Sequence, residues 1–522
     1  MKDVAKEYIP DGIAYEQHGD VVSFEVSPAE VVSLVRDYID KNLPLTLIDA
    51  TDERADNGCF KVWYVFGLPE KHYFIVPYIR VEKTEEFPSV ASITPAAGGY
   101  ERKIRTFFGL EPVGNPDSRP LILHENWPKG TYPLRKDFKQ TTRPKTAKNQ
   151  PYEFQKVDGE GIYEIPVGPI HAGIIEPGHF RFSVAGETIM LLEARLGYVH
   201  KGTEKLFESL PLDSQLRLAE KISGDSSFSH SLAFCQAVEQ LADIKVPARA
   251  LYLRTIFAEM ERLANHIGDI GFMMLDTGFN FGGSNGARLR EMVMRINGRL
   301  TGSRFLRGVT AIGGVTKDLS ADECESLIGE LTVLMADFEE VMEIAEESDP
   351  LLNRLKTAGP LSKVIAKDYG VVGVPARAVG LKRDARVEHP YAAYGILSPR
   401  MIVTEKTGDV HARFVVRIRE ARNAVSIVKE AIKALPNGGI IAAPLVIKLQ
   451  KNAVAIGCVE GWRGEIIHFV TTDAKGDIQR VAVRDPSFIN WQVVGFCGQG
   501  QVVPDFPLIN KSFNLSYTGN DL

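Results

Sequence analysis

The segment Glu220-Lys-Ile-Ser-Gly-Asp-Ser-Ser-Phe-Ser-His230 forms a short loop that leads into a helix, with Ser223 and Ser226 spaced like a C-x-x-C metal-ligand pair. A nickel or iron site of that kind needs soft thiolate ligands. Serine does not ionise usefully at neutral pH, so these side chains cannot replace thiolates. The segment therefore predicts the frame of a metal site in which the usual metal cannot be held.

Helical periodicity surrounds this segment. Apolar residues recur with a period near 3.6 along five stretches. These predicted helices cover residues 211–221, 227–242, 248–277, 286–301 and 321–347. The start Asp318-Leu-Ser-Ala-Asp-Glu is typical of a capped helix, and residues 413–434 form a further helix that ends before Pro436-Asn-Gly-Gly. Alternation over residues 466–472 and 478–483 predicts a hairpin.

The amino-terminal third has a different pattern. A helix is predicted over residues 28–42, and strands rich in Val, Ile and aromatic residues over 45–51, 61–68 and 73–81. Residues 1–137 are therefore expected to form a small α/β domain. A basic, polar stretch punctuated by prolines predicts a linker at 138–158. Residues 159–522 are expected to be mainly α-helical with peripheral β-strands, which makes the fold class α+β.

Composition excludes several classes of protein. The net charge of −6 argues against a nucleic-acid binder. The 5 cysteines are scattered and none lies in a C-x-x-C, so neither a disulfide scaffold nor a zinc site is expected. No secretory signal is visible, and no apolar stretch reaches the ~20 residues that span a bilayer. The run Phe281-Gly-Gly-Ser-Asn-Gly lacks the pattern of a nucleotide site.

Two regions resemble known families. The stretches Glu101-Arg-Lys-Ile-Arg-Thr-Phe-Phe-Gly-Leu, Asn115-Pro-Asp-Ser-Arg and Pro133-Leu-Arg-Lys-Asp-Phe are similar to the 30-kilodalton subunit of complex I. Residues 160–522 resemble both the 49-kilodalton subunit of complex I (NADH-quinone oxidoreductase) and the large subunit of membrane-bound energy-converting nickel–iron hydrogenases. The stretches that carry this second resemblance are Gly168-Pro-Ile-His-Ala-Gly-Ile-Ile-Glu-Pro-Gly-His-Phe-Arg-Phe182, Gly197-Tyr-Val-His-Lys-Gly-Thr-Glu-Lys205, Glu259-Met-Glu-Arg-Leu-Ala-Asn-His266, Val372-Gly-Val-Pro-Ala-Arg-Ala, His389-Pro-Tyr-Ala-Ala-Tyr, Glu460-Gly-Trp-Arg-Gly-Glu465 and Arg484-Asp-Pro-Ser-Phe-Ile-Asn. The chain looks like a fusion of the two subunits, closer to the hydrogenase branch.

Departures from the family pattern decide the expected chemistry. The four cysteines that hold nickel and iron in active hydrogenases align with Ser223, Ser226, Ser516 and Gly519. Hydrogen activation at nickel is therefore not expected, and the resemblance implies no metal bound by this chain. In complex I the equivalent cavity binds a quinone between a loop histidine and a tyrosine. The histidine resembles His179, whereas Gly224 occupies the tyrosine position.

The resemblance implies candidate catalytic residues around this cavity. His179, in a Pro-Gly turn, is the expected proton donor, because an imidazole with a pKa near 6.5 suits that role; His171 is a weaker candidate. Glu176 is a candidate relay, or alternatively a surface ion-pair partner. His230 lies beside the metal in hydrogenases and is otherwise a buried hydrogen-bonding residue. Arg377 resembles the arginine that overhangs the hydrogenase metals.

Other residues are expected near an iron–sulfur cluster of a partner subunit. Lys221 replaces a family arginine there, and its charge would favour a reduced cluster; alternatively it is a solvated surface residue. His266 resembles a family histidine near the same cluster and shares a helix face with Glu259 and Arg262. The remaining charged residues predict either buried networks and proton paths or ordinary surface pairs: Asp384, Arg386, Glu460, Arg463 and Glu465.

These observations leave three hypotheses. The chain is the large subunit of a nickel-free oxidoreductase that takes electrons from a partner iron–sulfur cluster and reduces a quinone-like acceptor, coupled to ion translocation. Alternatively it is a non-catalytic scaffold of an ion-translocating membrane complex, or a true hydrogenase. The first predicts a small iron–sulfur subunit, a ferredoxin-like subunit and membrane-arm subunits as partners. It places the chain peripherally on the cytoplasmic face of the membrane, with no activity of its own in isolation.

Overall fold

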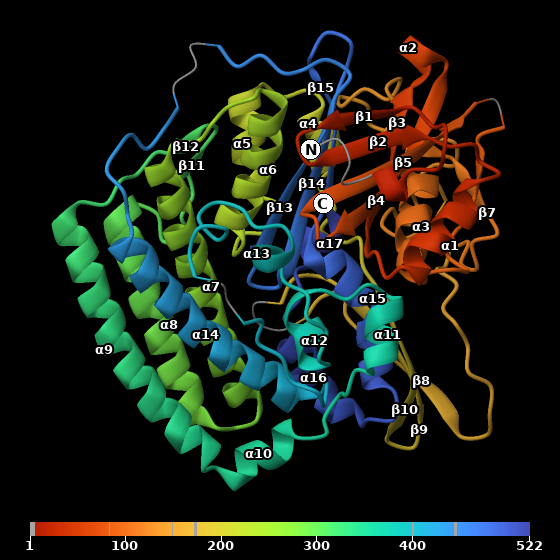
Figure 1. The fold of residues 1–522 in the computed structure, drawn as a ribbon. Coiled ribbons are helices and arrows are strands. Elements are labelled where there is room, and N and C mark those ends of the chain that lie inside the picture. Colours follow the sequence, from red (N-terminus) through yellow and green to blue (C-terminus); the bar gives the residue numbers. More distant parts are fainter. Residues whose placement is uncertain (1–5, 83, 149, 172–174, 399–400, 443–445) are drawn as a thin grey trace.

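The computed structural model describes residues 6–82, 84–148, 150–171, 175–398, 401–442 and 446–522. A five-stranded amino-terminal sheet stands beside a large body of helices (Figure 1). Its strands lie in the order β1 (Tyr15–His18), β2 (Val21–Glu25), β5 (Tyr73–Val81), β4 (Cys59–Leu68) and β3 (Leu45–Glu53). Only the β2–β5 pair of this sheet is parallel. Smaller elements complete this part, namely η1 (Lys6–Tyr8), α1 (Val31–Asp40), α2 (Arg54–Asn57), β6 (Glu86–Pro88), α3 (Ala96–Phe108) and β7 (Glu111–Val113).

Both faces of this sheet are covered. Helix α3 packs on β3, and apolar residues of a second sheet join the same hydrophobic core. The second sheet is antiparallel and consists of β13 (Val454–Gly461), β14 (Gly464–Thr472) and β15 (Ile478–Arg484). Trp63 of β4 and Phe469 of β14 meet with ring centroids 5.7 Å apart. Burial on both faces explains why β4, Cys-Phe-Lys-Val-Trp-Tyr-Val-Phe-Gly-Leu, is a nearly continuous apolar run rather than an alternating pattern.

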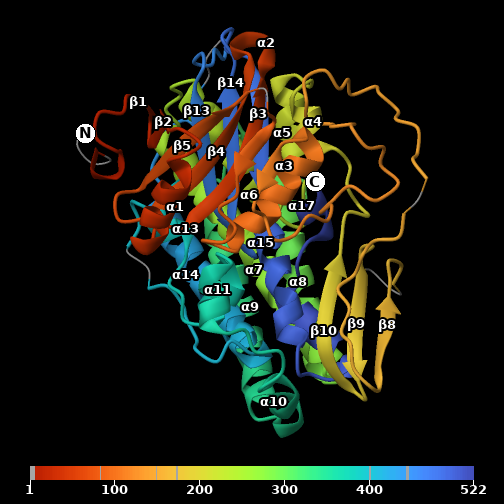
Figure 2. The same cartoon turned by 90° about the vertical axis from the view of Figure 1, so that its right-hand side faces the viewer.

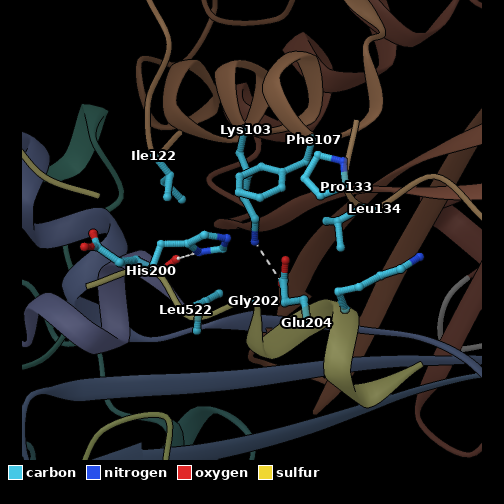
Figure 3. A pocket seen from close by; sticks show the side chains of 11 residues that line it. Lys103, Phe107, Ile122, Pro133, Leu134, His200, Gly202, Glu204 and Leu522 are labelled. Carbon is cyan, nitrogen blue, oxygen red and sulfur yellow. Dashed lines mark hydrogen bonds and ion pairs between the residues drawn. The ribbon is translucent and has the colours of Figure 1, made fainter. Parts of the chain in front are cut away.

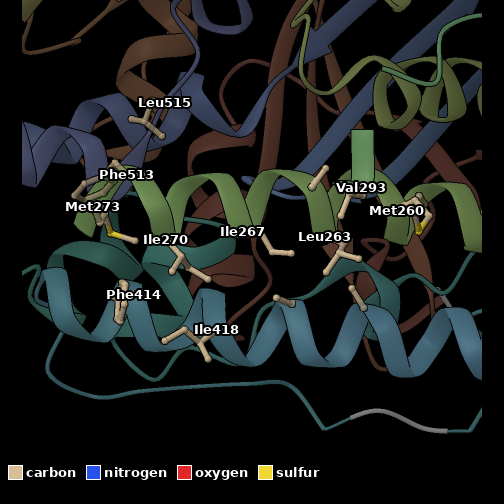
Figure 4. Close-up of a cluster of buried hydrophobic side chains, with 14 of the residues drawn as sticks. Met260, Leu263, Ile267, Ile270, Met273, Val293, Phe414, Ile418, Phe513 and Leu515 are labelled. Carbon is tan, nitrogen blue, oxygen red and sulfur yellow. The ribbon is translucent and has the colours of Figure 1, made fainter. Parts of the chain in front are cut away.

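The helical body is built around α7 (Ala248–Asp276). It packs against α8 (Asn280–Thr301) and α14 (Val410–Lys433), with α9 (Ala321–Glu346) outside (Figure 1). Figure 4 shows Leu263 and Ile270 of α7 directed at α14, whose Ile418 lies opposite Ile270. The backbones of α7 and α8 approach closely at two glycines, since a Cβ on Gly286 would lie 2.5 Å from the Gly271 Cα.

Shorter elements connect these layers. They are α4 (Thr203–Phe207), α5 (Leu212–Ala219), α6 (Ser227–Leu241), β11 (Thr310–Ala311), β12 (Gly314–Val315), α10 (Asp349–Leu355), α11 (Lys363–Asp368), α12 (Gly373–Ala378), α13 (Ala385–Glu388), α15 (Pro486–Gly498), η2 (Val503–Asp505), α16 (Phe506–Phe513) and α17 (Tyr517–Asp521). A three-stranded sheet of β8 (Ile162–Val167), β9 (His179–Ala185) and β10 (Thr188–Arg195) projects from one end (Figure 2). Strand β10 packs against α15.

Four buried charges join the amino-terminal sheet to the rest of the chain, and we call them the clamp: Asp49, Lys103, Glu204 and Arg480. Arg480 donates to both carboxylate oxygens of Asp49, at 2.8 and 3.0 Å, and to Glu204 at 3.0 Å. Lys103 reaches Glu204 at 2.8 Å beside a small cavity that His200 and Leu522 also line (Figure 3). Burial raises the pKa of Glu204, but Arg480 and Lys103 outweigh it and lower the pKa to about 2.

Most predicted elements are confirmed, and the fold class is α+β as expected. The capping box at Ser320 and Glu323 is present. Helix α8 begins at Asn280 rather than near residue 286, because glycines 282 and 283 pack tightly against Met274 and Leu275 of α7. The predicted linker contains neither helix nor strand among its described residues, while the domain limits themselves stay predictions. No helix in the described part of the chain combines the length and the apolar character that crossing a bilayer requires.

Candidate functional site

The positions assigned to the lost metal ligands converge in space, and we call Ser223, Ser226, Ser516 and Gly519 the serine cluster. Ser223 lies in the loop between α5 and α6, and its hydroxyl donates to the Ser516 hydroxyl at 3.0 Å. Ser516 caps α17 by accepting from the Gly519 amide at 2.9 Å. Ser226 stands at the start of α6. The loop before α6 and the start of α17, nearly three hundred residues apart in sequence, thus form one polar site.

An ion pair occupies the middle of this cluster. Arg463, in the turn between β13 and β14, donates to both Asp225 oxygens at 2.6 and 2.8 Å and approaches the Ser223 hydroxyl at 3.4 Å. The Asp225 side chain keeps 33% of its surface exposed, whereas that of Arg463 keeps 5%. Burial raises the pKa of Asp225, but Arg463 outweighs it and holds the pKa below its ordinary value. The carboxylate therefore stays ionised and faces solvent from one side.

The donor set does not fit a nickel–iron centre. Three hydroxyls and a glycine stand where four thiolates would be needed, and the guanidinium of Arg463 lies among them. A Cβ added at Gly519 would lie 2.5 Å from the Asp485 carboxyl group, so Asp485 fills the space of a side chain there. The residues at this site therefore do not provide the ligands of such a centre.

A buried chain of three titratable groups stands behind the cluster. His230 on α6 contacts Asp485, the cap of α15, at 3.0 Å and His468 of β14 at 3.2 Å. Burial lowers the pKa of His468 well below its usual value, so this imidazole is neutral. Burial raises the pKa of Asp485, but the hydrogen bond and charge of His230, with Arg463, bring it below the ordinary value. His230 is thus a buried hydrogen-bonding residue next to the serine cluster.

The loop before β9 brings Glu176, the candidate relay, to the same place. The amide of Thr518 donates to Glu176 at 3.3 Å, and the Thr518 hydroxyl lies 3.2 Å from that of Ser516. Gly178 packs against Tyr517, since a Cβ there would lie 2.4 Å from the ring. Glu176 therefore touches the serine cluster through α17.

His179 is buried at the first position of β9. Its Nδ1 lies 3.3 Å from the Gly168 carbonyl oxygen, and its Nε2 accepts from Arg181 at 3.4 Å. Burial, reinforced by Arg181, lowers the pKa of His179 although the Gly168 carbonyl opposes the shift. The imidazole is therefore neutral near pH 7, and both hydrogen bonds are long. The neighbouring His171 binds the Gly178 carbonyl oxygen at 2.7 Å and so fixes the loop.

The charged turn Glu460–Glu465 is buried rather than a solvated hairpin. Glu460 accepts from Arg377 at 2.7 Å, Arg463 holds Asp225, and Glu465 pairs with Arg484. The turn lies directly on α12, because a Cβ on Gly373 would lie 2.5 Å from the Gly464 Cα. Arg377 is therefore fully buried in an ion-pair cluster behind the turn, not over the serine cluster. The other members of that cluster are Glu259, Arg262, Asp384, Arg386 and Glu420.

The two residues predicted near a partner's iron–sulfur cluster differ in environment. Lys221 is exposed just after α5, close in sequence to the serine cluster. His266 is fully buried in α7, and neither ring nitrogen has a hydrogen-bond partner among the described residues. Burial, reinforced by Arg262 and Arg417, lowers its pKa well below the usual value, so the ring is neutral. Gly224, also exposed, lies opposite Arg307, whose Nη2 would be 3.4 Å from an added Cβ.

Sequence reasoning missed four residues at this site: Asp225, Glu261, His468 and Asp485. Asp225 lies between the two serines of the segment that predicted a lost metal site, and Asp485 lies in a stretch that carried the family resemblance. Glu261 accepts from the amides of Phe228 and Ser229 at the start of α6, at 2.7 and 3.1 Å. Burial raises its pKa to about 7 in spite of these donors. Asp225 is identified as a site residue by its ion pair with Arg463, and the sequence alone does not predict this contact.

Comparison with known proteins assigns each of the two parts of the chain to a family. Residues 24–144 match the family "Respiratory-chain NADH dehydrogenase, 30 Kd subunit", and residues 276–455 and 447–521 match the corresponding 49 Kd subunit family. Formate hydrogenlyase subunit 5 of Escherichia coli (strain K12) is 35% identical over 91% of this chain and 84% of its own length. An NADH-quinone oxidoreductase subunit of Phocaeicola vulgatus is 32% identical over 75% of this chain and 78% of its own length.

A solved structure agrees with these sequence relatives. A chain of the membrane-bound sulfane sulfur reductase, described as an archaeal respiratory membrane complex, superposes with a TM-score of 0.65 at 26% identity. The match covers 70% of this chain and 99% of that one. The protein therefore belongs to the family of complex I and hydrogenase large subunits, as a fusion of the 30- and 49-kilodalton parts.

Proposed function

We propose that this chain is the large subunit of a nickel-free, membrane-associated oxidoreductase. It receives electrons from an iron–sulfur cluster in a small partner subunit and passes them to a quinone-like acceptor beside the serine cluster. The acceptor contacts the hydroxyls of the cluster, the exposed edge of Asp225 and the loop of His179. Reduction drives ion translocation by membrane-arm subunits. The relatives named as NADH-quinone oxidoreductase subunits and as part of a respiratory membrane complex support this assembly.

One observation carries the proposal: the serine cluster is a polar, partly open site that Glu176 of the loop before β9 reaches through Thr518. Reduction of a quinone to a quinol takes up two electrons and two protons, so the site needs hydrogen-bond donors and a proton supply. Ser516 and Thr518 link Glu176 to Ser223 and the Asp225–Arg463 pair through consecutive contacts. Asp225 is the member of this pair that reaches solvent.

His179 would act as a neutral donor. Its Nδ1 is held by the Gly168 carbonyl at 3.3 Å, which is long for such a hydrogen bond. An acceptor oxygen could therefore replace that carbonyl at little cost. Gly224, exposed beside the cluster, leaves space for an acceptor ring where complex I-type relatives are expected to carry a tyrosine.

The test uses the intact complex purified from its own membranes, with its clusters reduced chemically. Quinone reduction is followed optically for the native complex, for His179→Ala and for the control His411→Ala on α14. We expect His179→Ala to lower turnover by 10²–10⁴-fold, as for loss of a general acid, and His411→Ala to leave it unchanged. Polysulfide serves as a second acceptor, because one relative is named a sulfane sulfur reductase.

Three results would count against the proposal. Turnover with polysulfide but with no quinone would show that the acceptor is a sulfur compound rather than a quinone. If His179→Ala slows the polysulfide reaction, the proposed site would still be the place of reduction. Reducible clusters without turnover on any acceptor would instead make the chain a non-catalytic scaffold of an ion-translocating complex. Nickel bound at one atom per chain would revive the hydrogenase hypothesis.

A further inference from the structure

A separate cavity of about 530 Å³ lies between α3, β10 and α15. This volume falls in the range of small-molecule sites in proteins. Phe488, Trp491 and Phe496 line it from α15, and Gly98 and Gly99 line it from α3. Aromatic side chains on one wall and side-chain-free backbone on the other favour a flat ligand, which can stack on rings and approach glycines closely.

The other side of the cavity is lined by three arginines, Arg102, Arg119 and Arg195. They form ion pairs with Asp117, Glu193 and Glu125, so their charges are largely balanced within the protein. Arg195 is only 3% exposed, and its Nε has no hydrogen-bond partner among the described residues. Leaving a buried cationic N–H unpaired is costly. An anionic group bound in the cavity would reduce that cost.

The cavity is distinct from the serine cluster but lies next to it. Trp491 donates its indole N–H to the Ser516 carbonyl at 3.3 Å, and its ring meets Tyr517 at 5.0 Å between centroids. Asn520, one residue after Gly519, also lines the cavity. A ligand bound in the cavity would therefore alter the contacts of Trp491 with Ser516 and Tyr517 at the start of α17.

We propose that this cavity binds a planar aromatic molecule that carries a carboxylate or phosphate group. The ring lies along the α15 aromatic residues opposite Gly98, and the anionic group lies among the arginines. The amides of Gln492 and Gln499 stand at the same wall and offer hydrogen bonds to carbonyl groups on the ring. The inference does not depend on the acceptor proposed for the serine cluster.

Flavin mononucleotide and riboflavin are a suitable pair of probes, because they share one planar ring and differ in the phosphate. Fluorescence anisotropy is measured with the full-length chain. We expect flavin mononucleotide to bind at micromolar concentrations and riboflavin about tenfold more weakly. Equal binding of the two would remove the anionic part of the proposal, and no binding of either at millimolar concentration would overturn it.

Gly98→Leu tests the place of binding. A Cβ at Gly98 meets only the Ala91 Cβ, at 3.9 Å, so the leucine side chain would fill the cavity without displacing neighbouring residues. Gly329→Leu is the matched control, because that helical glycine faces open space on α9. We expect Gly98→Leu to weaken binding at least about tenfold and Gly329→Leu to leave it unchanged. Equal affinity in both variants would overturn the proposal.

Gln492→Glu tests the charge without filling the cavity. The added carboxylate repels an anionic ligand, so flavin mononucleotide should lose more affinity than riboflavin. Equal losses would contradict an anionic ligand. Because neither readout uses electron transfer, these results are independent of quinone turnover.

Discussion

The clamp contains, and the serine cluster surrounds, an arginine bound to both oxygens of an aspartate, yet the two pairs differ in their surroundings. Asp49 and Arg480 each expose 2% of their side chains, and Lys103 and Glu204 complete a closed set of charges. Asp225 exposes 33%, and its other neighbours are hydroxyls. The same pair therefore joins two layers where it is sealed and forms a solvent-facing polar surface where it is open.

The largest difference in stability between the clamp and the serine cluster is expected when the arginine of each ion pair is removed. Arg480→Met leaves Asp49 and Glu204 buried without their main partner, which should cost about 3–5 kcal/mol of unfolding free energy. Arg463→Met should cost less, about 1–2 kcal/mol, because water can reach Asp225. Urea unfolding of the full-length variants measures both. Equal losses would show that the difference in exposure has no energetic consequence.

Cysteines placed in the serine cluster test whether it is a metal site lacking only its sulfurs. Ser223→Cys, Ser226→Cys and Ser516→Cys nearly preserve volume and should be tolerated. Gly519→Cys should cost about 1–3 kcal/mol through overpacking against Asp485. Thermal unfolding and nickel content of the fourfold variant check this. Stoichiometric nickel in a stable protein would contradict the described packing.

Titration separates the carboxylates of the two regions. Burial raises the pKa of Glu261, beside the serine cluster, to about 7. The contribution of its protonated form to the free energy of unfolding is therefore fully present below the ordinary glutamate pKa and is lost as the pH rises through about 7. The pKa of Glu204 is lowered to about 2, so its contribution is present at neutral pH and is lost as pH falls toward 2.

Glu261→Gln isolates the neutral-pH effect. Between pH 5 and 8 the native protein should lose on the order of 2 kcal/mol of unfolding free energy relative to this variant. Glu325→Gln, at an exposed position of α9, is the control. Parallel pH profiles for the native protein and Glu261→Gln would contradict the raised pKa.

The smallest effect on stability is expected at Gly224. Gly224→Tyr introduces, at an exposed position, the residue type that the resemblance to complex I leads us to expect, so the free energy of unfolding should change by less than about 0.5 kcal/mol. If a quinone binds beside the serine cluster, the KM of the complex for that quinone should fall in this variant, because the tyrosine hydroxyl adds a hydrogen-bond donor. A raised KM would indicate that the tyrosine blocks an acceptor that needs the space.

The sequence predicted long helices and the hairpin well because their apolar periodicity is strong. It missed β1 and β2, which are short, and α3, whose mixed polar pattern is stabilised by packing on β3. At the site, the convergence of Ser223 with Ser516 followed from the family resemblance. The roles of Asp225 and Asp485 did not, because both depend on contacts between segments more than two hundred residues apart. Likewise, nothing in the sequence places Arg377 behind the turn at Glu460.

The contact between Gly519 and Asp485 has a consequence for mutational history. A single change to cysteine at 519 meets the Asp485 carboxylate, and a single change that shortens Asp485 leaves His230 without its acceptor. A thiolate at position 519 therefore cannot be gained by one substitution without loss of stability, whereas the three serine positions are expected to accept cysteine. Four thiolates in this site would need coordinated changes at positions 519 and 485.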